Sequence, residues 1–173
     1  IEKKIIAWFQ GRSEFGPRAL GNRSFLADPR DDDIRDIIND KIKKRELFRP
    51  FAPSILEEHV HDFFEIDHES PYMSLIAKVK ENKKKLIPAV VHVDSTSRIH
   101  TVSKNINPLY YELINNFYKL TKVPVLLNTS FNIQEPIVYS PSNAIMTFIK
   151  SNVDILCIGN YFCDINWRKE IIS

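Results

Sequence analysis

The stretch Pro124-Val125-Leu126-Leu127-Asn128-Thr129-Ser130 says most about the fold. Its branched apolar residues predict a buried strand over 124–127. Three polar residues follow at once, and α/β sheets place ligands just past the ends of their strands. Asn and Ser also favour ordinary turns, so these residues leave a binding site and a simple turn both open.

Strands and helices alternate around this stretch. Short apolar or alternating runs predict further strands at 5–9, 72–79, 155–158 and 161–164, and a hairpin with arms 89–93 and 98–102. The segment 55–64 is ambiguous and is interpreted as a strand end and a short helix. Helices are predicted after the aspartates 31–33, after Asn107-Pro108 and after Ser140-Pro141. The apolar face of the second helix is predicted to consist of Leu109, Leu113, Ile114, Phe117 and Leu120. This order predicts an α/β or α+β fold with a mixed sheet.

The composition is that of a single globular domain. The chain has 173 residues, of which 43% are hydrophobic and 27% charged, with a net charge of +2. So small a charge makes nucleic acid an unlikely partner. No apolar run is long enough for a membrane span, and no signal peptide is visible. The chain has only two cysteines, Cys157 and Cys163, which fits a reducing cytoplasm. The chain begins with Ile, so we expect a fragment of a longer protein.

The segment 11–30 is predicted to be an ordered loop rich in cations. It contains three glycines and four arginines, which are Arg12, Arg18, Arg23 and Arg30. Guanidinium groups suit phosphate or carboxylate ligands because their donors form a planar fork. The alternative is that these arginines pair internally with Glu14, Asp28 and nearby carbonyls.

Other candidate residues lie farther along the chain. Lys43 and Arg49 flank the end of the first long helix, and Arg98 lies in a predicted strand, where it faces a cleft or solvent. Both the GxxxxGK[ST] and GxGxxG motifs are absent, so a bound nucleotide would be held by Arg and Lys side chains. His59 and His61 could share a strand face as metal ligands, but no further ligand supports them, and no metal site is predicted. For His92 and His100, a hydrogen-bonded structural role is favoured over a pocket role.

Taken together, these segments resemble the O-carbamoyltransferases, which include nodulation-factor and antibiotic carbamoyltransferases. Residues 11–24 read GRSEFGPRALGNRS, which closely resembles the family motif GRxEFGPRALGNRS. Further matches follow in order at 27–30, 43–54, 92–98, 124–132 and 135–138. The resemblance covers nearly the whole chain.

The resemblance implies a fold and a larger protein. In the family these motifs form a C-terminal domain with a YrdC-like fold, an open, twisted mixed β-sheet flanked by helices. Residues 1–173 are therefore expected to be one such domain. Its expected partner is an N-terminal sugar-kinase-like domain of the same polypeptide, which binds iron and the hydroxyl substrate and has no match here.

The resemblance also implies an activity. Carbamoyl phosphate and Mg²⁺-ATP would form carbamoyl-adenylate, and the carbamoyl group would pass to a hydroxyl of a small molecule or sugar. The residues carried over as ligands of ATP and carbamoyl phosphate are Arg18, Lys43, Arg49, Arg98, Asn128 and Ser130, with Lys43, Arg49 and Ser130 as the catalytic set. Several cations are needed because two polyanions meet in one cleft. Arg12, Arg23 and Arg30 are interpreted as structural supports.

Three departures from the family pattern concern local geometry. Ser95 replaces a glycine of the family, His100 replaces a glutamine, and the loop after Asn132 is one residue short. Two other functions stay open. One is a non-catalytic RNA- or nucleotide-binding module, and the other is threonylcarbamoyl-adenylate synthesis for tRNA modification.

Overall fold

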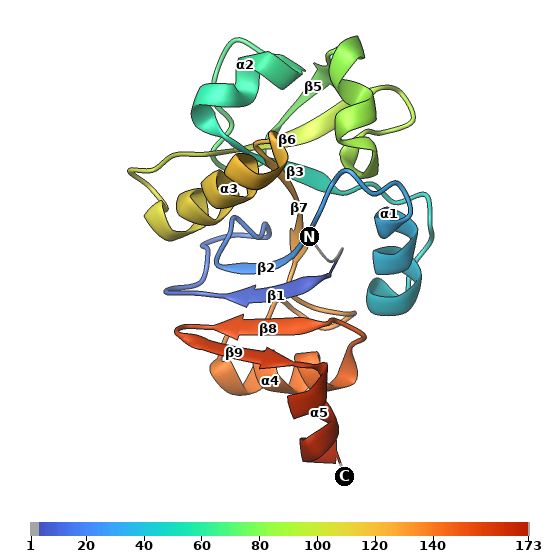
Figure 1. Cartoon of the computed structure of the whole chain (residues 1–173), viewed down its shortest axis with the longest axis vertical. Helices are drawn as coiled ribbons and strands as arrows, with labels where there is room; N and C mark the ends of the chain where they lie inside the picture. Colours follow the sequence, from blue (N-terminus) through green and yellow to red (C-terminus); the bar gives the residue numbers. More distant parts are fainter. Residues whose placement is uncertain (1–3, 173) are drawn as a thin grey trace.

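A computed structural model describes residues 4–172, apart from the side chains of residues 168, 171 and 172. Its strands form one nine-stranded sheet in the order β4-β5-β6-β3-β7-β2-β1-β8-β9 (Figure 1). The pairs β3–β6 and β1–β8 are parallel and the other pairs are antiparallel. The predicted open mixed sheet with flanking helices is therefore confirmed.

The bounds of the elements are as follows. The strands are β1 Ile6–Phe9, β2 Arg23–Ala27, β3 Ala52–Leu56, β4 Phe64–Glu65, β5 Leu75–Val79, β6 Thr96–Val102, β7 Val125–Ser130, β8 Ile155–Ile158 and β9 Tyr161–Asp164. The α-helices are α1 Ile34–Ile37, α2 Val60–Phe63, α3 Pro108–Thr121, α4 Pro141–Lys150 and α5 Ile165–Ile172. A π-helical turn, Ile38–Lys43, continues α1, and 3-10 turns occupy Glu57–His59, Glu81–Leu86 and Pro88–Val90. None of the described helices is both long and apolar enough to cross a membrane.

The central strands are covered on both faces. Phe9, Phe25 and Leu127 pack into a core with α1 and α4, whereas their neighbours Leu26 and Leu126 pack against α3 on the other face. Figure 1 shows α1 and α3 on opposite sides of the central strands. Because successive side chains of a strand alternate between faces, a strand covered twice is apolar throughout.

This double burial explains one wrong prediction. The segment 11–30 was expected to be loop throughout, but residues 23–27 form β2 in the middle of the sheet, and all five are buried. The sequence RSFLA shows no alternation because both faces are covered, and it begins with a charged residue. The Arg23 guanidinium is held there by three backbone carbonyls, so its charge does not disrupt the strand.

The predicted hairpin is also wrong in one arm. The second arm forms β6, but residues 88–90 make a 3-10 turn in place of a strand. Pro88 has no N–H to give to a sheet, and local bonds from Val90 and Val91 to the carbonyls of Ile87 and Pro88 close the turn. As a result β6 pairs with β5 and β3.

Several boundaries also differ from the prediction. β7 continues through the polar residues 128–130, and the strand predicted at 72–79 begins at Leu75. On α3 the predicted face residues Leu109 and Leu120 are exposed, whereas Tyr110 and Ile114 are buried. The helices α3 and α4 begin at the predicted Asn and Ser caps, each followed by Pro. α5 and β4 were not predicted.

Candidate anion-binding site

A cavity of about 220 Å³ lies where the loop 17–19 and the segment 45–52 meet strands β6 and β7. Five of the six predicted ligand residues line this pocket, which are Arg18, Arg49, Arg98, Asn128 and Ser130. Lys43 does not line it. Arg45 and Met73 line it without having been predicted as site residues. We refer to this cavity as the cationic pocket.

Among the described residues, the arginines of the cationic pocket form no ion pair with a carboxylate. Within residues 4–172 no acceptor bonds the guanidinium groups of Arg18, Arg49 or Arg98, and the buried Arg98 Nε has no hydrogen bond. Burial, and then the nearby charge of Arg18, lowers the pKa of Arg98. Burial, and then the charge of Arg49, lowers the pKa of Arg45 to about 10. The charges repel one another, so an anion bound among them would be stabilised.

Lys43 lies behind the wall of the pocket. It is 3% exposed, and its Nζ contacts Ser130 O at 2.6 Å, Ser130 Oγ at 3.2 Å, and Asn132 O and Oδ1 at 2.8 Å. Burial, and then the nearby Arg45, lowers the pKa of Lys43 to about 7. Lys43 thus ties the end of the π-helical turn to the end of β7 and fixes Ser130.

Asn128 is held by a buried network. Its Nδ2 donates to Ala19 O at 3.0 Å and to Ser54 Oγ at 2.9 Å, and Ser54 Oγ lies 2.8 Å from His100 Nδ1. A carbonyl oxygen only accepts, so the bond to Ala19 fixes which way the amide points. Burial lowers the pKa of His100 to about 4, so its ring is neutral at pH 7. His100 therefore has the hydrogen-bonded role that was favoured for it, whereas the half-buried His92 bonds Thr96 Oγ1 at 3.2 Å.

Comparison with known proteins confirms the family resemblance. A family model described as the carbamoyltransferase C-terminus matches residues 1–164. The chain belongs to this family. It is 55% identical over 161 residues to the nodulation protein NolNO of Sinorhizobium fredii, an alignment that covers 91% of this chain and 24% of the relative. It is 52% identical over 161 residues to the nodulation protein NolO of Bradyrhizobium diazoefficiens, covering 91% of this chain and 29% of the relative.

A third relative is the uncharacterized protein sll1178 of Synechocystis. It is 44% identical over 178 residues, covering 91% of this chain and 29% of the relative. The chain therefore spans about a quarter of the length of these relatives.

The carbamoyltransferase loop that carries Arg18 is organised by Glu14, whose role the sequence analysis missed. Its Oε1 accepts from the backbone N–H groups of Leu20 at 2.7 Å, Asn22 at 2.8 Å and Arg23 at 3.2 Å. One carboxylate oxygen thus closes the turn through charge-assisted bonds. The signal in the sequence was an acidic residue among glycines, but Glu14 was interpreted only as a possible ion-pair partner of the arginines.

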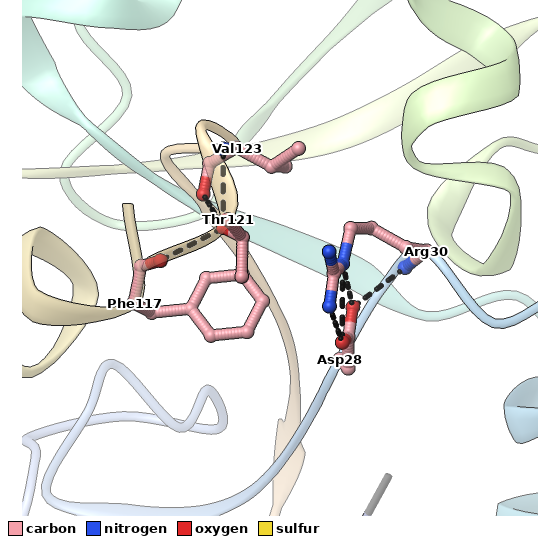
Figure 2. A network of polar contacts seen from close by, with 5 residues as sticks. All are labelled: Asp28, Arg30, Phe117, Thr121 and Val123. Carbon is pink, nitrogen blue, oxygen red and sulfur yellow. Dashed lines mark hydrogen bonds and ion pairs between the residues drawn. The ribbon is translucent and has the colours of Figure 1, made fainter. Parts of the chain in front are cut away.

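Two further arginines of the carbamoyltransferase motif are structural, as predicted. Arg23 is 3% exposed and lies 3.5 Å from the centre of the Phe9 ring. Arg30 Nη2 pairs with Asp28 Oδ2 at 2.6 Å, and Arg30 Nε bonds both oxygens of the same carboxylate (Figure 2). The guanidinium carbon of Arg30 lies 5.6 Å from the centre of the Phe117 ring. Both guanidinium groups are thus bonded within the fold, although the buried Arg23 Nε has no hydrogen-bond partner among the described residues. Arg12 is exposed.

The departures from the carbamoyltransferase pattern lie outside the cationic pocket. Ser95 has φ +65°, a left-handed conformation that favours the glycine of the family. In the short loop, the Glu135 carboxylate accepts from the N–H groups of Ile133 and Gln134 and from Thr147 Oγ1. The loop is therefore closed despite its missing residue.

His59 and His61 lie in a 3-10 turn and in α2, not on a strand face. They are bonded separately, to Asp62 and to the carbonyl of Ile66. Among the described residues there is no group of three or more His, Cys, Asp or Glu that could hold a metal ion.

Proposed function

We propose that this chain is the carbamoyl-activating module of an O-carbamoyltransferase, and that the cationic pocket binds the phosphates of ATP and carbamoyl phosphate. The observation that carries the proposal is a set of arginines with no carboxylate partner in the described chain, gathered in one pocket. Arg45 and Arg98 are half-buried, whereas Arg18 and Arg49 are exposed. A bound polyanion would offset the mutual repulsion of the four charges and the burial cost of the first two. The family of the chain supports carbamoyl transfer as the reaction.

The size of the pocket restricts which part of the ligand it holds. Ligand sites usually measure roughly 300–1,000 Å³, whereas this cavity measures about 220 Å³. We therefore assign it to the phosphates and the carbamoyl group, with the nucleoside outside. Its lining residues include no carboxylate within the described part of the chain, so Mg²⁺ would enter with the ATP phosphates.

The reaction that we propose balances with one water. Carbamoyl phosphate and water give carbamate and phosphate, and a carbamate oxygen then attacks the α-phosphorus of ATP and displaces pyrophosphate. Arg18, Arg49 and Arg98 would stabilise the charge that develops on the phosphoryl oxygens. The Ser130 hydroxyl donates to Asn132 Oδ1 and accepts from Lys43 Nζ, so it would offer its remaining lone pair to the carbamoyl amide. The buried Asn128 would help to shape the pocket wall.

The acceptor hydroxyl and iron are assigned to the N-terminal domain that the relatives' length leaves room for. No residue of this chain is given a role in binding either of them.

Titration calorimetry with Mg²⁺-ATP tests the site. Arg49→Ala and Ser130→Ala are each expected to weaken binding by about tenfold or more. The matched control is Lys41→Ala, which removes an exposed charge from the same π-helical turn and is expected to change nothing. Wild-type affinity in both site variants would refute the site assignment.

Exchange of labelled pyrophosphate into ATP tests the chemistry in the complete enzyme. The exchange is expected only when carbamoyl phosphate is present. Exchange that instead requires threonine and bicarbonate would replace this function with threonylcarbamoyl-adenylate synthesis. The absence of exchange with either set of substrates would refute the activating role.

A further inference from the structure

Asn39 is a fully buried residue whose backbone carbonyl and side-chain amide all bond the segment 44–49. Its backbone carbonyl accepts from the N–H groups of Lys44 and Arg45. Its side-chain Oδ1 accepts from Arg45 Nε at 2.7 Å, and its Nδ2 donates to Leu47 O at 3.1 Å and to Arg49 O at 2.9 Å. One residue therefore holds the segment that brings two arginines to the cationic pocket.

The bond to Asn39 fixes how Arg45 is presented. Its Nε is occupied, and its guanidinium carbon lies 4.9 Å from the centre of the Phe51 ring. Within the described residues, no acceptor bonds its terminal nitrogens. A guanidinium that is half-buried, oriented and unpaired at its outer edge is prepared for a bidentate oxyanion, because little rotamer entropy remains to be lost on binding.

The position of Arg45 adds a second constraint. Arg45 and Arg49 come from one fixed segment, whereas Arg18 and Arg98 come from the loop and from β6, and all four line the same cavity. Four guanidinium groups carry more positive charge than the charge of about −2 on a single phosphate can balance. A chain of linked phosphates carries more negative charge and spreads it along the cavity.

We propose that Arg45 is a further phosphate ligand of the cationic pocket and that it makes the pocket selective for linked phosphates over a single phosphate. This inference rests on the proposed function, in which the pocket binds ATP. It adds a residue that the motif comparison did not assign, and it names the polyphosphate chain as the part of ATP that this residue recognises.

The test is titration of tripolyphosphate and of orthophosphate into wild type, Arg45→Ala, Arg45→Lys and the control Lys41→Ala. Arg45→Ala is expected to weaken tripolyphosphate binding by about 10- to 50-fold and orthophosphate binding by less than threefold. Arg45→Lys keeps the charge but loses the planar fork and the bond to Asn39. It is therefore expected to restore only a minor part of the tripolyphosphate affinity that Arg45→Ala loses. A melting temperature for each variant separates these losses from unfolding.

The outcomes distinguish this proposal from the function on which it rests. Wild-type tripolyphosphate affinity in Arg45→Ala, together with lost affinity in Arg49→Ala, would overturn the role of Arg45 and leave the pocket as the ATP site. Equal losses for tripolyphosphate and orthophosphate would overturn the selectivity. Loss of tripolyphosphate binding in Arg45→Ala, in an enzyme without pyrophosphate exchange, would uphold Arg45 while refuting the proposed chemistry.

Discussion

The arginines of this molecule fall into two sets that differ in what surrounds them. Arg23 and Arg30 have their guanidinium groups bonded within the fold, to backbone carbonyls in one case and to Asp28 in the other. Arg18 and Arg98 have no such acceptor in the part of the chain that the structure describes, although Arg18 belongs to the same 11–24 motif as Arg23. Two arginines of one motif thus differ in whether the fold bonds their guanidinium groups.

This difference indicates that stability and ligand binding depend on different arginines of this fold. Removing a guanidinium that serves buried carbonyls leaves those carbonyls without donors, which costs stability. Removing one that has no partner leaves nothing unsatisfied and removes a repulsive charge. The first set should therefore affect unfolding and the second should affect ligand affinity.

The largest effect is expected from Arg23→Ala. It leaves the carbonyls of Gln10, Gly11 and Asn22 without this donor and opens a void beside Phe9. The free energy of unfolding is expected to fall by about 3 kcal/mol in urea denaturation. Arg12→Ala, at an exposed position of the same loop, is the control and is expected to change it by less than about 0.5 kcal/mol. An equal loss of unfolding free energy in the two variants would contradict the structural role of Arg23.

Arg98→Ala is the reciprocal experiment. Its affinity for Mg²⁺-ATP is expected to fall by about 30-fold, equivalent to about 2 kcal/mol, because a charge-assisted bond is lost. Its unfolding free energy should stay equal to that of wild type or rise slightly, since the buried Arg98 Nε has no partner to lose. A variant that unfolds as readily as Arg23→Ala but binds ATP normally would place Arg98 in the structural set.

Lys43 sharpens the comparison because it is a buried cation surrounded by neutral acceptors. Its pKa is about 7 in the fold, well below the ordinary lysine value of 10.5. Between these pH values the unfolded chain holds a proton that the folded chain has released, so stability rises with pH in this range. From pH 7 to 8.5, wild type is expected to gain about 1–2 kcal/mol relative to Lys43→Met in urea denaturation. Parallel pH profiles would show that Lys43 stays charged.

The sequence predicted those parts of the fold that local signals determine. The Asn107-Pro108 and Ser140-Pro141 caps began their helices where expected, and β8 and β9 have the predicted bounds. It failed at β2, where burial on both faces removes the alternation that marks a strand. That burial depends on α1, which follows β2 closely, and on α3, which is more than 80 residues away in sequence.

The ligand residues of the candidate site were predicted from the family resemblance, because local sequence patterns left their roles open. The resemblance placed five ligand candidates that do share a pocket, and the charge of Arg45 was visible without any sign that it faces the same cavity. Sequence could not show that Lys43 is enclosed by Ser130 and Asn132, because these contacts join segments 87 and 89 residues apart.

The smallest effect is expected from Arg30→Ala. Its pair with Asp28 is partly exposed on the Arg30 side, at 37%, whereas Asp28 is 7% exposed. Losing the pair leaves a mostly buried carboxylate with fewer donors, so we expect a loss of about 1 kcal/mol in unfolding free energy. The double variant Asp28→Asn with Arg30→Ala should recover part of it, because the uncompensated charge is gone. ATP affinity should be unchanged in both, and a tenfold loss would move Arg30 into the binding set.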